Sequence, residues 1–549
     1  MKDDLRNRFI AIVGDAHAAT ADNDIAPHLR EWRARWTGAA AAVLKPGTTS
    51  EVAAILKLAS ETGTPIVPQG GNTGLVGGQI PDASGEAIIV STNRLNRIRA
   101  IDVDGDTMTV EAGVVLETIQ EAADAHDRLF PLSLAAQGWA QIGGNLSTNA
   151  GGTGALAYGV ARDLCLGLEV ALPNGEVLDD LNRLKKNNTG YDLRDLFIGA
   201  EGTLGIITAA VLKLHPKPSG RAAAFLAVPS PDAALTFFRQ ARSRCGPSLT
   251  TFELMARMGI DFTVRHMHGA RDPLDQAYPW YVLVELSSGR SEADARAELD
   301  HLVETGFGEG TLADGVVAES EAQRQSLWHL REAMSESQIP EGGSIKHDIS
   351  VPVSAIPAFL DEAGKAVAAI VPDARPCPFG HMGDGNLHYD ILPGVGQDIP
   401  AFIGRWKEGS QVVHDLVSRY ELGRSEGVVL RYLTDAYRTL RQSVPESKKN
   451  EELADLIEWL GEVIRQTDSS LLDEWELLTD PDVSAEQVAE LAFGESAGAV
   501  QGIVARAYET SLREGRKSFI QQNGWSASCY TDASGSIRTL CSVGRIPPG

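Results

Sequence analysis

Cysteine is scarce in this 549-residue chain, which has five cysteines and no C-x-x-C pair. A sparse, odd-numbered set argues against an iron–sulfur cluster and a disulfide framework, and it fits a reducing compartment. Long apolar runs are lacking too. None approaches the ~18 residues of a membrane span, and the short run at residues 9–14 does not resemble a signal peptide. We therefore expect a soluble, cytoplasmic protein without a transmembrane segment.

The chain has fewer basic residues than acidic ones. The chain has 49 lysines and arginines against 74 aspartates and glutamates, so its formal net charge is -25. A surface this acidic repels phosphate backbones, so we expect no nucleic-acid partner. The acidic residues form either a solvated surface or a docking site for a basic electron-acceptor protein, and the composition leaves both open.

Short apolar segments alternate with amphipathic ones in the first 220 residues. Thr48 and Glu51 form a capping-box pattern that predicts the start of a helix, and Gly63 predicts its end. The pattern predicts strands at residues 41–45, 65–67, 107–114 and 209–214, and a second helix at residues 116–125. We therefore expect an α+β fold.

Changes in composition divide the chain into three regions. The stretch PKPSG at residues 216–220 is typical of a domain boundary, and a second α+β region follows it. Beyond about Tyr420 the sequence becomes acidic, with helical apolar spacing at residues 451–478. We expect domains at residues 1–218, 219–424 and 425–549, the last of them mainly helical.

Three glycine-rich segments carry the first chemical signal. The segment PQGGNTGLVGG occupies residues 68–78, IGGNLSTNAGGTG residues 142–154, and FIGAEGTLGIIT residues 197–208. Glycine lets the backbone approach a ligand closely, and successive N–H groups can cradle a pyrophosphate. The first segment has neither G-K-[ST] nor G-x-G-x-x-G, which excludes P-loop and Rossmann fingerprints there. Alone it also fits a structural turn, but three such segments indicate a long ligand such as FAD.

The order of these segments, with YG at residues 158–159 and NTGYDL at residues 188–193, resembles the vanillyl-alcohol-oxidase type of FAD-binding fold. The D-2-hydroxyglutarate/D-lactate dehydrogenase branch is the most similar, over about residues 36–420. The resemblance implies a two-part FAD-binding domain and an α+β substrate domain. Some members attach FAD through a histidine of the first segment, and this chain has none there, so we expect non-covalent FAD.

The resemblance also implies which residues contact the cofactor. These are Pro68, Gly70, Gly71, Asn72, Thr73, Gly74, Gly143, Gly144, Asn145, Thr148, Asn149, Gly151, Gly152, Tyr158, Gly159, Gly202, Gly205 and Ile206.

A second motif, PFGHMGDGNLHYDIL at residues 378–392, predicts a β-hairpin with Asp384-Gly385 as a two-residue turn. Counting outward from this turn places His381 opposite His388, where two imidazoles can share one metal ion. Two isolated histidines also fit a purely structural role. Members of the family hold zinc or a similar divalent metal with this pair, and the resemblance implies that Asn386 faces the substrate.

A third set of residues suits carboxylate binding. Arg331 and Ser335 lie one helical turn apart in REAMS, and Lys346 follows in IKHDIS at residues 345–350. A guanidinium can bind a carboxylate through two hydrogen bonds, although the same residues also fit a surface salt-bridge set. In the family, the matching residues bind substrate carboxylate groups. Two cations and a hydroxyl suit a dicarboxylic acid better than lactate.

The resemblance implies a dehydrogenase that passes a hydride from a D-2-hydroxy acid, with D-2-hydroxyglutarate as the best candidate, to FAD. The electron acceptor stays open among a quinone, a cytochrome and an electron-transfer flavoprotein. An oxidase of the same fold acting on alditols or aromatic alcohols would need neither the paired histidines nor the carboxylate-binding set.

The sequence departs from the family near residue 422. The family continues with an A-E-H-G-I-G segment whose glutamate completes the metal site, whereas this chain reads LGRSEGVVL at residues 422–430. Glu426 lies one residue short of the expected position, and we predict it as the third ligand. Residues 425–481 resemble instead a C-terminal domain of some DEAD/DEAH-box helicases. The alternative hypothesis is therefore an FAD-binding chimera with impaired catalysis and an interaction tail.

Overall fold

The computed structural model describes residues 1–422 and the short segments 525–526, 530–531, 537–538 and 544–545. The chain divides into two compact units, residues 1–420 and 421–549. In the second unit, β19 (Trp525–Ser526) pairs with β22 (Gly544–Arg545), and β20 (Tyr530–Thr531) pairs with β21 (Ile537–Arg538). The helix expected at residues 451–478 lies outside the described residues.

The first unit begins with a four-stranded sheet in the order β1-β2-β4-β3. The strands are β1 (Ala18–Ala19), β2 (Ala42–Leu44), β3 (Ile66–Gln69) and β4 (Ile88–Ser91). Two long helices accompany it, α1 (Asp3–Val13) and α3 (Thr49–Thr62). The predicted start of α3 is confirmed, because the Thr48 hydroxyl accepts the amide of Glu51 at 3.1 Å. Gly63 ends this helix at φ +66°.

A five-stranded antiparallel sheet follows, in the order β5-β6-β10-β8-β9. Its strands are β5 (Ile98–Asp102), β6 (Thr107–Glu111), β8 (Cys165–Ala171), β9 (Val177–Asp180) and β10 (Ile206–Lys213). Helices α4 (Leu116–Asp124) and α5 (Ile142–Ser147) share its apolar core. The remaining short elements before residue 220 are η1 (Asp15–His17), α2 (Asp22–Ile25), η2 (Ala26–His28), β7 (Arg128–Leu129), α6 (Ala155–Tyr158), α7 (Arg194–Phe197) and β11 (His215–Pro216).

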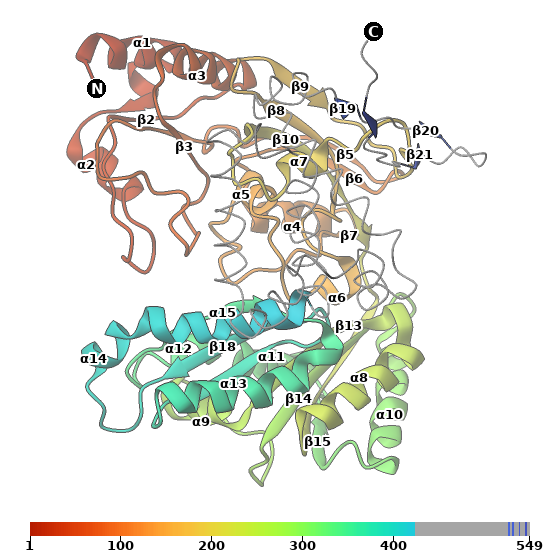
Figure 1. The fold of residues 1–549 in the computed structure, drawn as a ribbon. Helices are drawn as coiled ribbons and strands as arrows, with labels where there is room; N and C mark the ends of the chain where they lie inside the picture. Colours follow the sequence, from red (N-terminus) through yellow and green to blue (C-terminus); the bar gives the residue numbers. More distant parts are fainter. Residues whose placement is uncertain (423–524, 527–529, 532–536, 539–543, 546–549) are drawn as a thin grey trace. The chain divides into compact units, whose positions relative to one another are not determined.

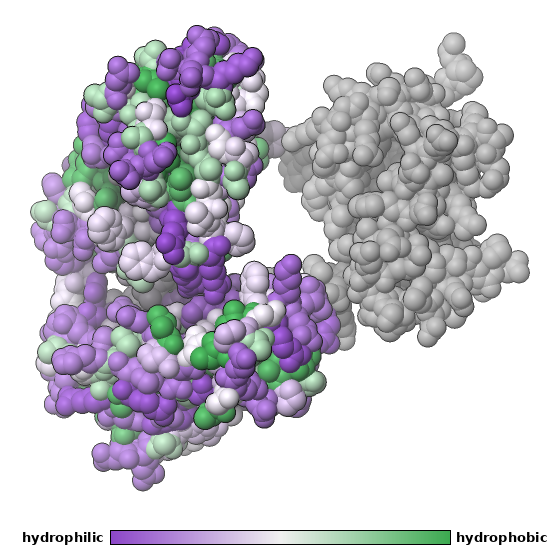
Figure 2. Space-filling model, turned by 90° about the vertical axis from the view of Figure 1, so that its left-hand side faces the viewer, coloured by the Kyte–Doolittle hydropathy of each residue, from purple (hydrophilic) through white to green (hydrophobic). Residues whose placement is uncertain are grey.

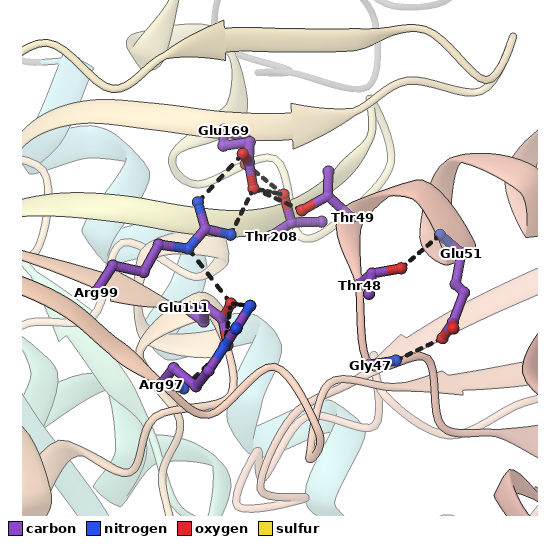
Figure 3. A network of polar contacts seen from close by, with 9 residues as sticks. All are labelled: Gly47, Thr48, Thr49, Glu51, Arg97, Arg99, Glu111, Glu169 and Thr208. Carbon is purple, nitrogen blue, oxygen red and sulfur yellow. Dashed lines mark hydrogen bonds and ion pairs between the residues drawn. The ribbon is translucent and has the colours of Figure 1, made fainter.

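A polar network joins the start of α3 to the five-stranded sheet (Figure 3). The Glu169 carboxylate accepts hydrogen bonds from Thr49 at 2.6 Å and from Thr208 at 2.8 Å. Arg99 donates both to Glu169, at 3.1 and 3.2 Å, and to the buried Glu111, at 3.3 Å. The hydrogen bond from Thr49 to Glu169 therefore joins α3 to this sheet, and the arginine contacts fix the Glu169 carboxylate that accepts it.

A seven-stranded antiparallel sheet forms the second half of the unit, in the order β15-β12-β14-β13-β17-β18-β16. Figure 1 draws this half of the unit in green to cyan, with α8, α10, α13 and α15 labelled on it. Its strands are β12 (Gly220–Val228), β13 (Leu249–Ala256), β14 (Trp280–Ser288), β15 (Asp314–Val317), β16 (Asp348–Ser350), β17 (Arg375–His381) and β18 (Asn386–Leu392). With the two N-terminal sheets it confirms the predicted α+β class.

Helices cover both faces of this sheet. One face packs against α8 (Pro231–Cys245), α10 (Glu292–Gly308), α13 (Ile356–Ile370) and α15 (Trp406–Leu422). The other packs against α9 (Arg257–His266), α11 (Glu321–Glu332) and α12 (Met334–Ser337). The remaining elements are η3 (Gly246–Ser248), η4 (Val353–Ala355) and α14 (Ile399–Gly404). The second set of helices covers only part of its face, and polar residues occupy the rest.

Candidate functional site

A large cleft brings the glycine-rich segments together with the predicted substrate residues. Its lining includes Gly70, Gly144 and Gly202 from the N-terminal sheets, and Lys346 and His381 from the seven-stranded sheet. The cavity volume is about 1490 Å³, above the roughly 300–1,000 Å³ of ordinary small-ligand pockets. Figure 2 shows the surface hollowed between these two parts of the unit. The cleft is large enough for a dinucleotide and a small substrate together.

Several glycines bring the backbone close to its neighbours here. A Cβ on Gly71 would lie 1.9 Å from the Trp139 carbonyl oxygen, and one on Gly152 2.1 Å from that of Ser133. A Cβ on Gly144, in contrast, would meet no protein atom within 4 Å. The predicted cofactor residues that line the cleft are Pro68, Gly70, Gly71, Asn72, Thr73, Gly74, Gly143, Gly144, Asn145, Thr148, Gly151, Gly152, Gly202 and Ile206.

Four predicted cofactor residues are absent from this lining and have structural contacts instead. Asn149 accepts the amide of Arg162 at 3.0 Å, and the Tyr158 ring packs edge-on against His215. A Cβ on Gly159 would collide with Asp163, and one on Gly205 with the backbone of Ala171. The second glycine segment also differs from the expected loop, because its start forms α5. Gly143 lies on this helix, where a Cβ would approach that of Ala112 to 2.6 Å.

Polar atoms in the cleft fit a ligand that donates hydrogen bonds. The Oδ1 atom of Asn145 is buried and has no hydrogen-bond partner among the described residues, and the same is true of Oδ1 of Asn72. A buried acceptor without a partner is costly, and a bound molecule carrying N–H or O–H groups removes that cost. Both residues belong to the glycine-rich segments, so the residues present fit a dinucleotide.

The hairpin motif folds with a register different from the predicted one. His381 pairs with Asn386, and His388 with Phe379, so the turn is four residues long instead of two. The Met382 side chain is fully buried in the core, which draws this residue out of the strand. The predicted direct pairing of His381 with His388 was therefore wrong. The two residues are diagonal neighbours.

The two histidines nevertheless share a face of the sheet, because residues two apart on a strand point the same way. Their ring centroids lie 5.8 Å apart. Two imidazoles bound to one tetrahedral metal, with N–metal distances near 2.0–2.1 Å, would have centroids roughly 5 Å apart. A metal ion shared by this pair stays a prediction. The described residues contain no group of three or more histidine, cysteine, aspartate or glutamate side chains that would complete such a site, and Glu426 lies outside them.

Glu253 on β13 is a central residue of the site that sequence reasoning missed. It pairs with His381 across the β13–β17 ladder and is 1% exposed. Its carboxylate accepts Nδ1 of His381 at 2.6 Å and Nε of Arg331 at 2.7 Å. Burial would raise the pKa of Glu253, but the charges of Arg331 and His381 outweigh it and lower the pKa to about 2. Glu253 is therefore a fixed negative charge between the two groups.

The two histidines differ in their preferred charge. Burial, with the charge of Arg331, lowers the pKa of His388 to about 4, so His388 is neutral at pH 7. Burial would also lower the pKa of His381, but the charge and hydrogen bond of Glu253 raise it above its ordinary value. The hydrogen bond uses Nδ1 of His381 and leaves Nε2 as the atom available to a ligand.

The predicted carboxylate-binding residues also meet in the cleft. Arg331 and Ser335 are separated by the end of α11 at Glu332, yet both line the cavity. The Lys346 ammonium donates to the Ser335 hydroxyl at 3.1 Å and forms an ion pair with the buried Asp390 at 2.8 Å. Lys346 and Arg331 are therefore both paired with buried carboxylates. Their assignment to substrate carboxylates stays a prediction.

Asn386 is placed differently from the expectation. It is not among the residues lining the cleft, and its amide donates to Asp348 at 2.7 Å and to the Ile349 carbonyl at 3.2 Å. Both bonds connect β18 with β16. In this structure Asn386 therefore stabilises the strand pairing that supports His388.

Within the part of the chain that the structure describes, no helix combines the length and the apolar character needed to cross a membrane.

Comparisons with protein families agree with this geometry. The model of the FAD binding domain matches residues 40–180, and the model of the C-terminal domain of FAD linked oxidases matches residues 217–421. FAD binding is thereby established for the first unit. A domain of unknown function, DUF3516, matches residues 406–521 and includes the segment expected to resemble a helicase-associated domain.

Individual proteins are also similar. D-2-hydroxyglutarate dehydrogenase of Xanthomonas citri pv. viticola is 36% identical over 402 residues, which cover 73% of this chain and 83% of the relative. A putative mitochondrial D-lactate dehydrogenase of Schizosaccharomyces pombe is 36% identical over 370 residues, covering 66% and 70%. Because that relative is named mitochondrial, the cytoplasmic location stays a prediction.

Among solved structures, p-cresol methylhydroxylase with substrate bound superimposes with a TM-score of 0.59 at 15% identity, covering 85% of this chain and 95% of that one. At this identity the likeness concerns the fold alone. The predicted vanillyl-alcohol-oxidase type of fold and the resemblance to its D-2-hydroxy-acid dehydrogenase branch are confirmed.

Proposed function

Because this chain belongs to the family of FAD-dependent D-2-hydroxy-acid dehydrogenases, we propose that its substrate is D-2-hydroxyglutarate and its product 2-oxoglutarate. The family defines the reaction class, and the proposal adds the substrate. The observation that carries it is the single cleft in which the glycine-rich segments face Arg331, Ser335 and Lys346. With FAD held by the glycine-rich segments, the hydride acceptor and the proposed carboxylate site would share this cavity.

The glycine-rich segments would hold FAD without a covalent bond. When bound, FAD supplies the acceptor for the hydride from the substrate Cα. The backbone around Gly71 and Gly74 would cradle the pyrophosphate, and Gly144 leaves room for the cofactor. We keep residues 1–218 as the proposed cofactor domain, residues 219–424 as the substrate domain, and residues 425–549 as an extension.

Arg331, Ser335 and Lys346 would bind and orient the substrate carboxylates. Arg331 is held by Glu253 and by packing over the Phe379 ring at 4.9 Å. Lys346 is fixed by Ser335, Gln338 and Asp390. Cations whose positions are fixed before binding lose little entropy when the substrate arrives, which favours a reactive orientation.

His381 and His388 would hold a divalent metal, with zinc as the expected ion and Glu426 as the proposed third ligand. Such a metal would bind the substrate's 2-hydroxyl and lower its pKa. His388 is neutral and His381 is oriented through Nδ1 by Glu253, which is the usual arrangement around a metal-bound imidazole. We also keep a quinone, a cytochrome and an electron-transfer flavoprotein as candidate electron acceptors.

The test is an anaerobic titration of the full-length protein with D-2-hydroxyglutarate, followed at the flavin absorption band. We expect bleaching of the band, and we expect His381→Ala to abolish it at unchanged FAD content. His301→Ala is the matched control, because His301 is exposed on α10. Flavin absorbance without bleaching by any D-2-hydroxy acid would support the alternative, an FAD-binding chimera with impaired catalysis, and would overturn the proposal.

A further inference from the structure

The loop that brings Lys346 to the cleft is organised around one glutamine, Gln338. This residue follows α12 and is 1% exposed. Its backbone carbonyl accepts the amides of Glu341, at 3.2 Å, and Gly343, at 3.1 Å. Its side-chain carbonyl accepts the Ser344 hydroxyl at 2.6 Å and the Lys346 ammonium at 3.1 Å. The two carbonyl groups of one residue therefore close this loop on itself.

The far end of the loop is fixed to the seven-stranded sheet. The backbone of Ile345 exchanges hydrogen bonds with that of Ile391 on β18, at 2.8 and 2.9 Å. This pairing lies next to Lys346 and Asp390, whose side chains form an ion pair of 2.8 Å. Lys346 therefore has a fixed backbone, and the position of its ammonium depends on the groups that surround it.

Three side-chain acceptors surround the Lys346 ammonium. They are Asp390 at 2.8 Å, the Ser335 hydroxyl at 3.1 Å and Oε1 of Gln338 at 3.1 Å. An ammonium has three N–H donors, so this set matches its capacity. The four-carbon stem of a lysine is flexible, and each acceptor that is removed frees some of its rotamers. Of the three, Gln338 alone is absent from the lining of the cleft, so it can hold the lysine without contacting a substrate.

The Gln338 amide lies in an orientation that leaves one of its own groups unpaired. Its Nε2 atom is buried and has no hydrogen-bond partner among the described residues. Turning the amide over would direct Nε2 towards the Lys346 ammonium, which donates hydrogen bonds and accepts none. A buried donor without a partner is costly. The hydrogen bonds from Lys346 and Ser344 therefore fix this orientation in spite of that cost.

We propose that Gln338 is a positioning residue, which fixes the Lys346 ammonium in the place where it binds a substrate carboxylate. This inference rests on the proposed function of the same cleft, and it names a residue that acts on the substrate only through Lys346. An ammonium that is fixed before binding loses little conformational entropy when the carboxylate arrives. Loss of the Gln338 side-chain carbonyl should therefore weaken substrate binding more than it slows hydride transfer.

The experiment measures kcat, KM and FAD content in the full-length FAD-loaded protein, with D-2-hydroxyglutarate and an artificial electron acceptor. Gln338→Met removes the carbonyl and keeps an unbranched side chain of similar length. We expect its KM to rise about 10-fold, the effect of one hydrogen bond to a charged group, with kcat within about twofold of the wild type. Gln325→Met is the matched control, because Gln325 is exposed on α11, and it should change neither constant.

Two further variants separate positioning from a general effect on folding. Gln338→Glu keeps an acceptor for Lys346 and adds a negative charge close to it, so its KM should rise as well through repulsion of the substrate carboxylate. In a Lys346→Met background, Gln338→Met should have no further effect on kcat/KM, because the group that it positions is absent.

The outcomes separate this inference from the proposed function. An unchanged KM in folded, FAD-loaded Gln338→Met protein would overturn the role of Gln338. A fall in kcat at constant KM, a loss of FAD, or the same loss of kcat/KM in the Lys346→Met background also overturns it, because the residue then acts on the fold or independently of the lysine. In these cases the wild type still reduces its flavin with D-2-hydroxyglutarate, and the proposed function stands. If the wild type reduces its flavin with no D-2-hydroxy acid, the proposed function fails and this inference fails with it.

Discussion

Glu253 and His381 are joined by a hydrogen bond of 2.6 Å although 128 residues separate them in the sequence. The bond forms because β13 and β17 pair in a register that places the two residues side by side. The same carboxylate holds Arg331 at 2.7 Å. One buried charge thus fixes both a proposed metal ligand and a proposed substrate-binding residue, which makes it the first residue to test.

We predict that Glu253→Gln destabilises the protein by about 3 kcal/mol, because it leaves the buried Arg331 without a counter-charge. It should also weaken metal binding by about 10- to 100-fold, since His381 loses its oriented acceptor. Urea unfolding and metal content after dialysis against a weak chelator measure the two effects. Glu86→Gln is the control on an exposed loop. Unchanged metal retention in a folded Glu253→Gln protein would contradict the positioning role.

The ion pair of Lys346 with Asp390 gives a second prediction. Asp390 is 2% exposed, so Lys346→Met alone leaves a buried charge unpaired and should cost about 3 kcal/mol of stability. The double variant Lys346→Met with Asp390→Leu should regain much of that loss, because no charge is then left unpaired. Both proteins should bind D-2-hydroxyglutarate poorly. A double-mutant cycle by urea unfolding measures the coupling, and strictly additive effects would argue against the pair.

Short-range patterns in the sequence predicted those structural features that depend only on residues close together in the chain. The capping of α3 at Thr48 and the glycine-rich segments follow from short-range rules and appear in the structure. Glu253 could not be found in this way, because it acquires His381 as a neighbour only through the pairing of β13 with β17, 128 residues apart in the sequence. No motif marks such residues.

The hairpin shows why register is harder to predict than the presence of a turn. The Asp384-Gly385 pair is a good two-residue turn in isolation. In the protein, the amides of Asp384 and Gly385 donate to the His381 carbonyl at 3.2 and 3.1 Å, and Met382 is buried in the core. The loop therefore spans Met382 to Gly385, and the two histidines lie in diagonal instead of opposed positions.

The network of Arg99 with Glu111 and Glu169 predicts a dependence of stability on pH. Burial would raise the pKa of both carboxyls, but their arginine partners outweigh it and hold each pKa below its ordinary value. Groups with a lowered folded pKa stabilise above the unfolded pKa of about 4.3 and lose that stabilisation as the pH falls towards the folded pKa.

Arg99→Leu should therefore cost about 1–2 kcal/mol at pH 7, and the difference from wild type should shrink as the pH falls below about 4. Urea unfolding at a series of pH values measures it. Arg290→Leu, whose side chain is 78% exposed, is the control and should change little at any pH. A difference that grows on acidification would show that these carboxylates do not carry the effect.

Alanine variants of two glycines in the cleft distinguish a role in folding from a role in cofactor binding. Gly71→Ala would place a methyl group 1.9 Å from the Trp139 carbonyl oxygen, so it should destabilise the protein with or without FAD. Gly144→Ala meets no protein atom within 4 Å and lies inside α5, so the apoprotein should keep its stability or gain up to about 1 kcal/mol. FAD affinity should nevertheless fall, because the methyl group occupies space proposed for the ligand.

Thermal unfolding of the apoproteins and FAD titration by fluorescence quenching measure the two effects. Normal FAD affinity in Gly144→Ala would place the cofactor away from α5.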